Sequence, residues 1–225
     1  MTEISIHPVQ AQIVLLLLSQ SNQSFSQLNK GELTNDWFSY HLRQVIKKGW
    51  VEKSGKKYVL SSVGKKLALQ VNPQEYELSQ PQRVSVLLVI QDDDNYLIQQ
   101  RLSEPFYGVW EFPTARIPFG VQAQQFAEEL LKQETGIITK LQFCGVNQKV
   151  ETKNKAFFDD KYYLVFKGLK EGGEMLLNFP GGKNFWLTKQ ELLAKEKTHF
   201  DLRNTLRIIE GKSEMTFING EVSEY

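Results

Sequence analysis

Apolar residues in the first sixty positions recur with helical spacing and then with the spacing of short strands. Three helical segments are expected, at 9–20, 24–31 and 34–49. The first is hydrophobic on most sides, the second lies between a capping Ser24 and Gly31, and the third carries apolar residues three and four positions apart. Pro8 suits the first turn of the first helix. Residues 50–60 contain two brief β-type runs around a Ser-Gly pair, which predicts a hairpin. The expected order is helix, helix, helix, hairpin.

From residue 83 onward, β-type apolar runs alternate with one clear helix. That helix covers about 122–135, and a second helical pattern lies at 198–210. Strands are expected at 83–90, 96–102, 141–146 and 161–169. This mixture predicts an α+β fold for the second part of the chain.

A segment with two prolines and no apolar periodicity, residues 71–82, separates the two patterns and is typical of a linker. A chain of 225 residues that is 41% hydrophobic is long enough for two domains with a core each. We therefore expect an N-terminal domain over 1–70, a larger domain over 83–210 and a C-terminal tail over 211–225.

Charge is unevenly distributed along the chain. Residues 1–75 hold nine Lys/Arg and five Asp/Glu, a balance of +4, which leaves −3 for the rest of a chain whose total is +1. Residues 34–66 contain eight basic and two acidic residues. This asymmetry indicates that the N-terminal part alone meets a polyanion.

Cysteine content and the apolar runs limit the protein's environment. Cys144 is the only cysteine, which excludes an intramolecular disulfide and a cysteine zinc cluster. The longest apolar run, residues 13–18, is far below the roughly 20 residues that span a bilayer. The start of the chain, MTEISIHPVQ, lacks the positive charges and cleavage site of a signal peptide. We expect a cytoplasmic protein without membrane contact.

The string WFSYHLRQVIKKGWVEKSGKKYVLSSVGKKLA, residues 37–68, has a Tyr-His-Leu in the third helix, a glycine before the hairpin and a Tyr-x-Leu-Ser-x-x-Gly segment after it. With these features residues 8–70 resemble the winged helix-turn-helix domains of bacterial and archaeal transcriptional regulators. The resemblance implies that DNA is a partner, with the third helix in the major groove and the hairpin as the wing.

A recognition helix reads base edges, while the wing and the helix ends contact phosphates. The third helix offers residues that its core face does not need, and the hairpin offers lysines. The DNA contacts expected from them are Asn35, Ser39, Tyr40, Arg43, Lys47, Lys53, Lys56 and Lys57. Two alternatives stay open: the lysines are ordinary solvent-exposed surface residues with no role in DNA binding, or the domain binds protein.

The second half contains a strand that ends in Gln100-Arg101, then Gly-x-Trp-Glu-Phe-Pro at 108–113, and NFWLTKQELLAK at 184–195. These motifs resemble the Nudix family over roughly residues 83–197. Family hydrolases cleave a nucleoside diphosphate linked to another moiety, using divalent metal held by G-x5-E-x7-R-E-U-x-E-E-x-G-U, where U is aliphatic. The resemblance implies an α/β/α sandwich with a mixed sheet.

Aligned on Gly136, this box has lost most of its acidic positions. The substitutions are Ala115 for the first glycine, Val121 for the first glutamate, Leu130 for the glutamate of the Arg-Glu pair, and Gln133 for the first of the Glu-Glu pair. Glu134 is the only box carboxylate that is retained.

At 100° per residue, positions 130, 133 and 134 share one helical face. Magnesium prefers several oxygen ligands, and an aliphatic side chain supplies none. Glu128 and Glu129 point away from this face. We therefore expect no catalytic set and no cofactor, with Mg²⁺ bound only if the chain is a hydrolase after all.

A pocket without its catalytic metal can still bind a ligand. Trp110 and Phe112 are candidates for stacking on a base, and Arg101 and Arg116 for pairing with diphosphate oxygens. The alternative is that Trp110 and Phe112 belong to the core and to a strand end.

Three functions remain open from the sequence. The first is a homodimeric regulator whose winged helix binds DNA and whose degenerate Nudix domain binds a nucleotide-type effector. It resembles Nudix-related regulators of NAD and sugar metabolism, which bind ADP-ribose-like effectors but place the Nudix domain first. The second is an active Nudix hydrolase with an auxiliary domain. The third is a binding module similar to the Nudix-like domain of adenine-specific DNA glycosylases.

Overall fold

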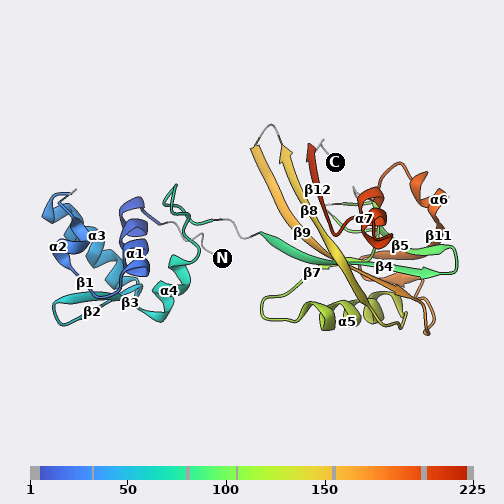
Figure 1. Ribbon diagram of the computed structural model, residues 1–225, viewed down its shortest axis with the longest axis horizontal. Helices are drawn as coiled ribbons and strands as arrows, with labels where there is room; N and C mark the ends of the chain where they lie inside the picture. Colours follow the sequence, from blue (N-terminus) through green and yellow to red (C-terminus); the bar gives the residue numbers. More distant parts are fainter. Residues whose placement is uncertain are drawn as a thin grey trace. The chain divides into compact units, whose positions relative to one another are not determined.

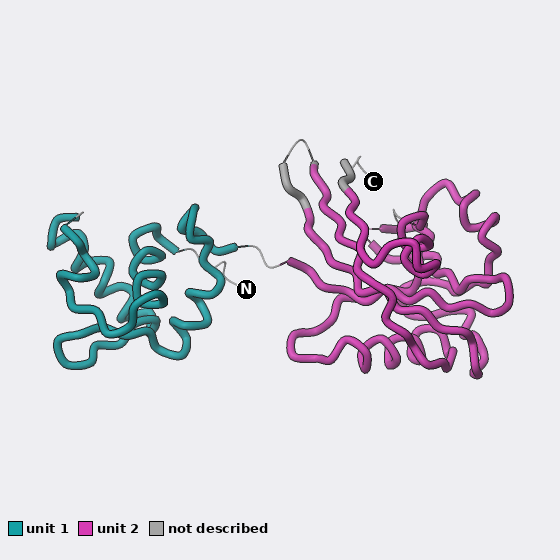
Figure 2. Tube along the Cα trace, viewed as in Figure 1, with its two compact units in different colours: residues 1–81 teal, residues 82–225 magenta. Residues whose placement is uncertain are grey.

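The computed structural model describes residues 6–31, 33–79, 82–104, 106–153, 156–198 and 202–221. It divides into two compact units, residues 1–81 and 82–225, which Figure 2 shows in different colours. Each unit has its own hydrophobic core and is described by itself. Among the described residues, no helix is long and apolar enough to cross a membrane.

The N-terminal unit combines helices with a small antiparallel sheet of strand order β1-β3-β2 (Figure 1). Three helices and the hairpin lie where the apolar spacing predicts them, whereas β1 and α4 were not predicted. The elements are α1 (Pro8–Ser19), β1 (Gln23–Ser24), α2 (Phe25–Asn29), α3 (Asn35–Lys47), β2 (Val51–Ser54), β3 (Lys57–Leu60) and α4 (Ser62–Ala68).

Short-range signals set the ends of these elements. The Thr34 hydroxyl caps α3 by accepting from the Trp37 N–H at 3.4 Å. Ser61 caps α4 in the same way and donates to the Gly49 carbonyl at 2.6 Å, which ties the helix to the end of α3. Gly55 turns the β2–β3 hairpin with a φ of +62°, a conformation that side chains other than glycine rarely adopt.

The core of this unit contains apolar side chains from its four helices and its hairpin. Its most buried members include Ile13, Val14 and Val45. Val71 also belongs to the core and pairs with Leu78. Part of the segment expected as a linker therefore packs on the N-terminal unit, because single apolar contacts leave no periodic pattern in the sequence.

The larger unit is a mixed sheet with helices on both faces, and the described strands follow the order β10-β11-β5-β4-β9-β8-β12, with β6 on β5 and β7 on β4. This is the α+β arrangement that the sequence predicts. Its elements are β4 (Arg83–Asp92), β5 (Asn95–Arg101), β6 (Trp110–Glu111), β7 (Thr114–Arg116), α5 (Ala123–Thr135), β8 (Gln142–Lys153), β9 (Ala156–Leu169), β10 (Asn178–Phe179), β11 (Gly182–Thr188), α6 (Lys189–Leu193), α7 (Leu202–Ile209) and β12 (Met215–Glu221).

Strand β4 shows why the sheet is covered on both faces. Its side chains alternate: Val86 and Leu88 pack with α5, whereas Leu87 and Val89 pack with α6 and α7. Figure 1 shows α5 along one face of the sheet and α7 on the other. The parallel pairing of β4 with β9 places the strand inside the sheet, which explains its nearly continuous apolar run.

The short strands β6, β7 and β10 were not among the expected strands. Two larger differences concern the length of a hairpin and the C-terminal tail. The hairpin formed by β8 and β9 is longer than the expected runs at 141–146 and 161–169. The expected tail contains β12, which pairs in parallel with β8. Both depend on pairing between distant segments, so polar residues in these strands obscured them in the sequence.

Candidate functional site

Helix α5 carries the positions at which the box would hold metal. Leu130 is 7% exposed and packs in the core between α5 and the sheet. Gln133 is exposed, and Glu134 is partly buried. The three positions expected to share one face therefore range from core to solvent. Glu128 and Glu129 are exposed, as expected, and accept hydrogen bonds from Gln124 and Gln125.

Glu134 is held by two buried amide side chains. Gln99 Nε2 donates to Glu134 Oε2 at 3.2 Å and to Asn184 Oδ1 at 3.1 Å. Asn184 Nδ2 donates to the carbonyls of Glu134 at 2.8 Å and Leu176 at 2.7 Å. Burial raises the pKa of Glu134, although the bond from Gln99 opposes this shift. The carboxylate of Glu134 is thus tied to β5 through Gln99, and its backbone carbonyl to β11 through Asn184.

A second carboxylate, Glu111, is buried beside Arg101. The pairing of β5 with β6 sets Glu111 opposite Gln99, and Arg101 Nη1 donates to Glu111 Oε1 at 3.1 Å. Burial raises the pKa of Glu111 to about 7, even though Arg101 and Lys161 attract its negative charge. Near neutral pH this carboxyl therefore binds a proton far more readily than an exposed glutamate does.

Arg101 and Lys161 both lie near the ring of Phe106, at 5.5 and 5.4 Å from its centroid. The two cations therefore occupy the same neighbourhood, although they come from β5 and β9. We call the residues Gln99, Arg101, Glu111, Glu134, Lys161 and Asn184 the central cluster.

Lys161 also belongs to an ion network on β4, β8 and β9, whose members on β8 and β9 are largely buried. Arg83 Nε donates to Asp159 Oδ1 at 2.8 Å, and Lys161 pairs with the same carboxylate. Lys149 pairs with Glu151, which lies 3.8 Å from Lys161. Burial opposes the charge of Asp159, but hydrogen bonds from Arg83 and Lys161 outweigh it and lower the pKa.

Burial lowers the pKa of Lys149 to about 8, because its effect is larger than that of the pairing with Glu151, which raises the pKa. The network is notable because Lys149, Glu151 and Lys161 are all less than 8% exposed. Charged residues at these positions interrupt the apolar pattern of β8 and β9, so the sequence did not single them out.

The structure does not bring the four expected ligand residues together. Arg101 lies in the central cluster, and Arg116 is exposed on β7. Trp110 and Phe112 flank Glu111 in the chain and point to the opposite side, because neighbours in a strand alternate. Phe112 is 3% exposed and is core, which was the alternative interpretation. Trp110 packs against Phe185, with ring centroids 4.9 Å apart.

Glu111→Gln should remove one pH-dependent loss of stability. The ordinary pKa of this carboxyl is 4.5 and its folded pKa is about 7, so between these values the folded chain binds an extra proton. Stability from this group is full below pH 4.5 and declines as pH rises toward 7, by about 3 kcal/mol in all. Urea unfolding at several pH values between 4.5 and 8 measures the decline.

Glutamine keeps the shape of the neutral acid, so the variant should lack this part of the slope. Glu128→Gln, on the exposed side of α5, is the matched control and should retain the wild-type slope. Parallel curves for wild type and Glu111→Gln would contradict the assignment.

Comparison with known proteins identifies the domain that carries this cluster. A family model described as the NUDIX domain matches residues 81–207, more than half of the 225-residue chain. The chain belongs to the Nudix family. Comparison with curated proteins gave no match.

Solved structures share the Nudix fold. The chain is similar to a MutT protein from Bacillus halodurans, with 21% identity and a TM-score of 0.50, over 63% of this chain and 90% of that one. It is also similar to the Nudix domain of Shewanella oneidensis NrtR complexed with ADP ribose, with 14% identity and a TM-score of 0.51, over 68% and 100%. At these identities the likeness shows the fold.

The described residues of the Nudix domain do not fit the family's metal site. No group of three or more His, Cys, Asp or Glu side chains that could hold a metal ion occurs among them. Leu130 fills core space where the box has a glutamate, and Glu134 accepts a hydrogen bond from Gln99. Magnesium, which needs several oxygen ligands, therefore lacks its usual donors on α5.

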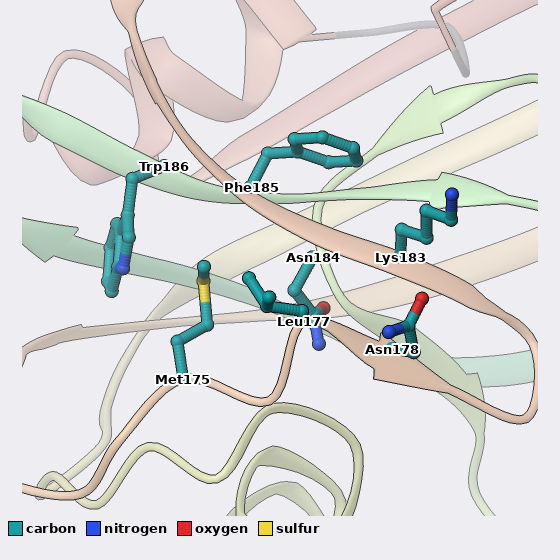
Figure 3. Close-up of a pocket in the computed structure, with 7 residues that line it drawn as sticks. All are labelled: Met175, Leu177, Asn178, Lys183, Asn184, Phe185 and Trp186. Atoms are coloured by element: carbon teal, nitrogen blue, oxygen red, sulfur yellow. The ribbon is translucent and has the colours of Figure 1, made fainter.

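A pocket of about 520 Å³ lies next to the central cluster. Its lining includes Asn184, whose amide already binds Glu134, Leu176 and Gln99. Figure 3 shows Phe185 and Trp186 on opposite sides of β11, with Met175 and Leu177 on the side of Trp186. Asn178 and Lys183 complete the lining and offer groups that can donate to a ligand. This volume is typical of a small-molecule site.

The N-terminal unit presents most of the expected DNA contacts on its surface. Exposed members are Asn35, Tyr40, Arg43, Lys47, Lys53, Lys56 and Lys57, and Ser39 is partly buried. Asn35 Oδ1 accepts from the buried Asn29 at 3.2 Å, which fastens the α2–α3 turn. Trp37 is 49% exposed, although it was not among the expected DNA contacts. Tryptophan is highly buried on average, and this preference kept Trp37 out of the predicted set.

Proposed function

We propose that this protein is a DNA-binding transcriptional regulator whose Nudix domain binds a nucleotide-type ligand of the ADP-ribose class without cleaving it. The observation that carries the proposal is Leu130, a buried core residue at the position where the family box has a metal-binding glutamate. The chain keeps the fold of this family, but among its described residues helix α5 does not present the carboxylate set of the box.

DNA binding is supported by the N-terminal unit. Its order of three helices and a hairpin is that of a winged helix-turn-helix, with α3 as the recognition helix and β2–β3 as the wing. The basic residues between 34 and 66 outnumber the acidic ones by six, and Lys53, Lys56 and Lys57 are exposed on the hairpin. A basic helix and wing fit the phosphate backbone on both sides of a groove.

Ligand binding is supported by the central cluster and its neighbouring pocket. Arg101 and Lys161 supply positive charge for diphosphate oxygens. Trp186 and Met175 supply an apolar wall of the pocket. The NrtR Nudix domain, which shares the fold, was solved with ADP ribose.

For regulation, the ligand must bind the DNA-competent and DNA-incompetent states with different affinities, since equal binding shifts no equilibrium. We expect the regulator to be a symmetric homodimer that reads two half-sites. The expected half-site separation is then about one helical turn of DNA, or a multiple of it.

The test is a binding assay with a pool of random 30-base-pair duplexes between 0.05 and 0.3 M salt, followed by sequencing of the bound fraction. Several phosphate contacts should give a slope of log K against log salt of about −4 or steeper, and a preferred sequence should survive competitor DNA. ADP-ribose at millimolar concentration should change the affinity. No binding at the lowest salt would overturn the regulator assignment.

Hydrolysis is the second candidate, favoured by one observation. Burial, with a smaller contribution from the charge of Glu134, raises the pKa of Glu111 to about 7, which suits a general base. Incubation of the protein with Mg²⁺ or Mn²⁺ and ADP-ribose, NADH or nucleoside triphosphates distinguishes hydrolysis from binding without cleavage. Turnover near 1 s⁻¹ or faster, ordinary for an enzyme, would favour hydrolysis; intact ligand favours binding alone.

A further inference from the structure

An aromatic cluster occupies the N-terminal half of α3. The rings of Trp37 and Tyr40 stack with centroids 6.1 Å apart and 18° between their planes. His41 packs edge-on against both, at 4.7 and 5.1 Å, and stacks on His7 at 4.2 Å. The four rings form one continuous contact surface.

The inner ring of this cluster is buried. His41 is 2% exposed, and neither of its ring nitrogens has a hydrogen-bond partner among the described residues. Burial lowers the pKa of His41, and the neighbouring His7 adds to this effect. The largely uncharged imidazole packs against the inner sides of Trp37 and Tyr40.

The outer rings face solvent in a basic surrounding. Trp37 is 49% exposed and Tyr40 48%. Tyr40 lies on the same side of the helix as Arg43 and Lys47, three and seven residues further on, and both are exposed. Asp36 is the only acidic residue of α3. Paired exposed aromatics are typical of a contact surface, and the positive charge around these favours an anionic partner.

We propose that Trp37 and Tyr40 read thymine methyl groups in the major groove, so that the protein prefers duplexes containing A·T pairs. The inference rests on the proposed DNA binding and specifies which bases α3 contacts. The C5-methyl of thymine is the apolar group that the major groove displays, and aromatic side chains are among those that contact it. Phosphate contacts from the hairpin hold the helix in place and carry no such preference.

The experiment measures binding of the full-length protein to poly(dA-dT), poly(dA-dU) and poly(dG-dC) duplexes of equal length at one salt concentration. Uracil lacks the methyl group and otherwise pairs as thymine does. Removal of each methyl contact should weaken binding roughly fourfold, the factor that corresponds to one buried methylene. Poly(dG-dC) should bind more weakly than poly(dA-dT).

The variants separate this contact from general DNA binding. The double variant Trp37→Ala with Tyr40→Ala should bind the thymine and uracil duplexes with equal affinity, whereas Trp37→Phe should keep part of the affinity difference between them. Leu69→Ala, the control, removes an exposed apolar side chain outside α3 and should keep the whole affinity difference. Thermal unfolding checks that each variant is folded, and the uracil substitution tests the idea in the unaltered protein.

Equal affinity of the wild type for the thymine and uracil duplexes would overturn the inference while leaving DNA binding intact. A methyl preference that survives in the double variant would overturn it too, as would tighter binding to single-stranded poly(dT), which would indicate stacking on unpaired bases. Absence of binding to every duplex would instead remove the proposed function and point to a protein partner for these rings.

Discussion

Replacing Lys53, Lys56 and Lys57 with alanine should weaken DNA binding on the order of a hundredfold at 0.2 M salt. Each phosphate contact contributes roughly 0.9 to the slope of log K against log salt, so three lost contacts remove about 2.7 from the slope. All three lysines are exposed, on β2, in its turn and on β3. Fluorescence anisotropy of a labelled duplex between 0.05 and 0.3 M salt measures both quantities.

The matched control removes the same charge from the Nudix domain. Lys132, Lys140 and Lys197 are exposed there, and their replacement with alanine changes the net charge equally. If DNA binding depends on the hairpin, this control should leave the salt slope nearly unchanged. Equal losses in the two triple variants would show that overall charge, and not a wing, determines the affinity.

The second large effect is on stability, because Glu151→Leu should lower the free energy of unfolding of the Nudix domain by about 3–5 kcal/mol. Glu151 pairs with Lys149 and lies within 3.8 Å of Lys161. The two lysines are 3% and 7% exposed, so the leucine leaves buried positive charge without this partner. Urea unfolding of wild type and variant at pH 7 measures the loss.

The double variant Lys149→Met with Glu151→Leu is the control for volume and hydrophobicity. Replacing both ions of a buried pair with apolar residues is often neutral, so it should recover most of the stability. The pKa of Lys149 is already lowered to about 8, and loss of Glu151 should lower it further.

The unfolded chain keeps the lysine charged near its ordinary pKa of 10.5. Between pH 7 and 8 the unfolded state of Glu151→Leu therefore binds more protons than the folded state, and its stability should rise with pH. A deficit that stays constant over this range, or a double variant as unstable as the single one, would contradict the role of the network.

The sequence predicted the motif residues of the candidate site better than the residues that surround them. Arg101 and Glu134 were found because the family motif names their positions. Glu111 lay within the same motif and was passed over, since a carboxylate beside two aromatic residues gives no sign of being buried next to Arg101. Gln99 and Asn184 lie 85 positions apart in the chain, on β5 and β11, yet they bond to each other and both bind Glu134. No local sequence pattern indicates a contact between segments so far apart.

Burial was the property that local reasoning predicted least well. Leu130 was recognised as a lost ligand, but its place in the core follows from how α5 packs on the sheet. For Phe112 the sequence left stacking on a base and a place in the core both open, and the residue is core, whereas Trp37 is half exposed. Helical and strand periodicity assign faces to an element, but the neighbours that cover each face come from distant segments.

The sequence by itself determined most of the longer helices and strands, the α+β class, the basic character of the N-terminal part and the loss of the box glutamates, because these depend on local spacing and residue type. Only the tertiary structure decided that β12 completes the sheet, that residues near Val71 fold onto the first unit, and that Glu111 and Glu151 are buried. These features arise from pairing and packing between residues far apart in the chain, whose energy no short window of sequence contains.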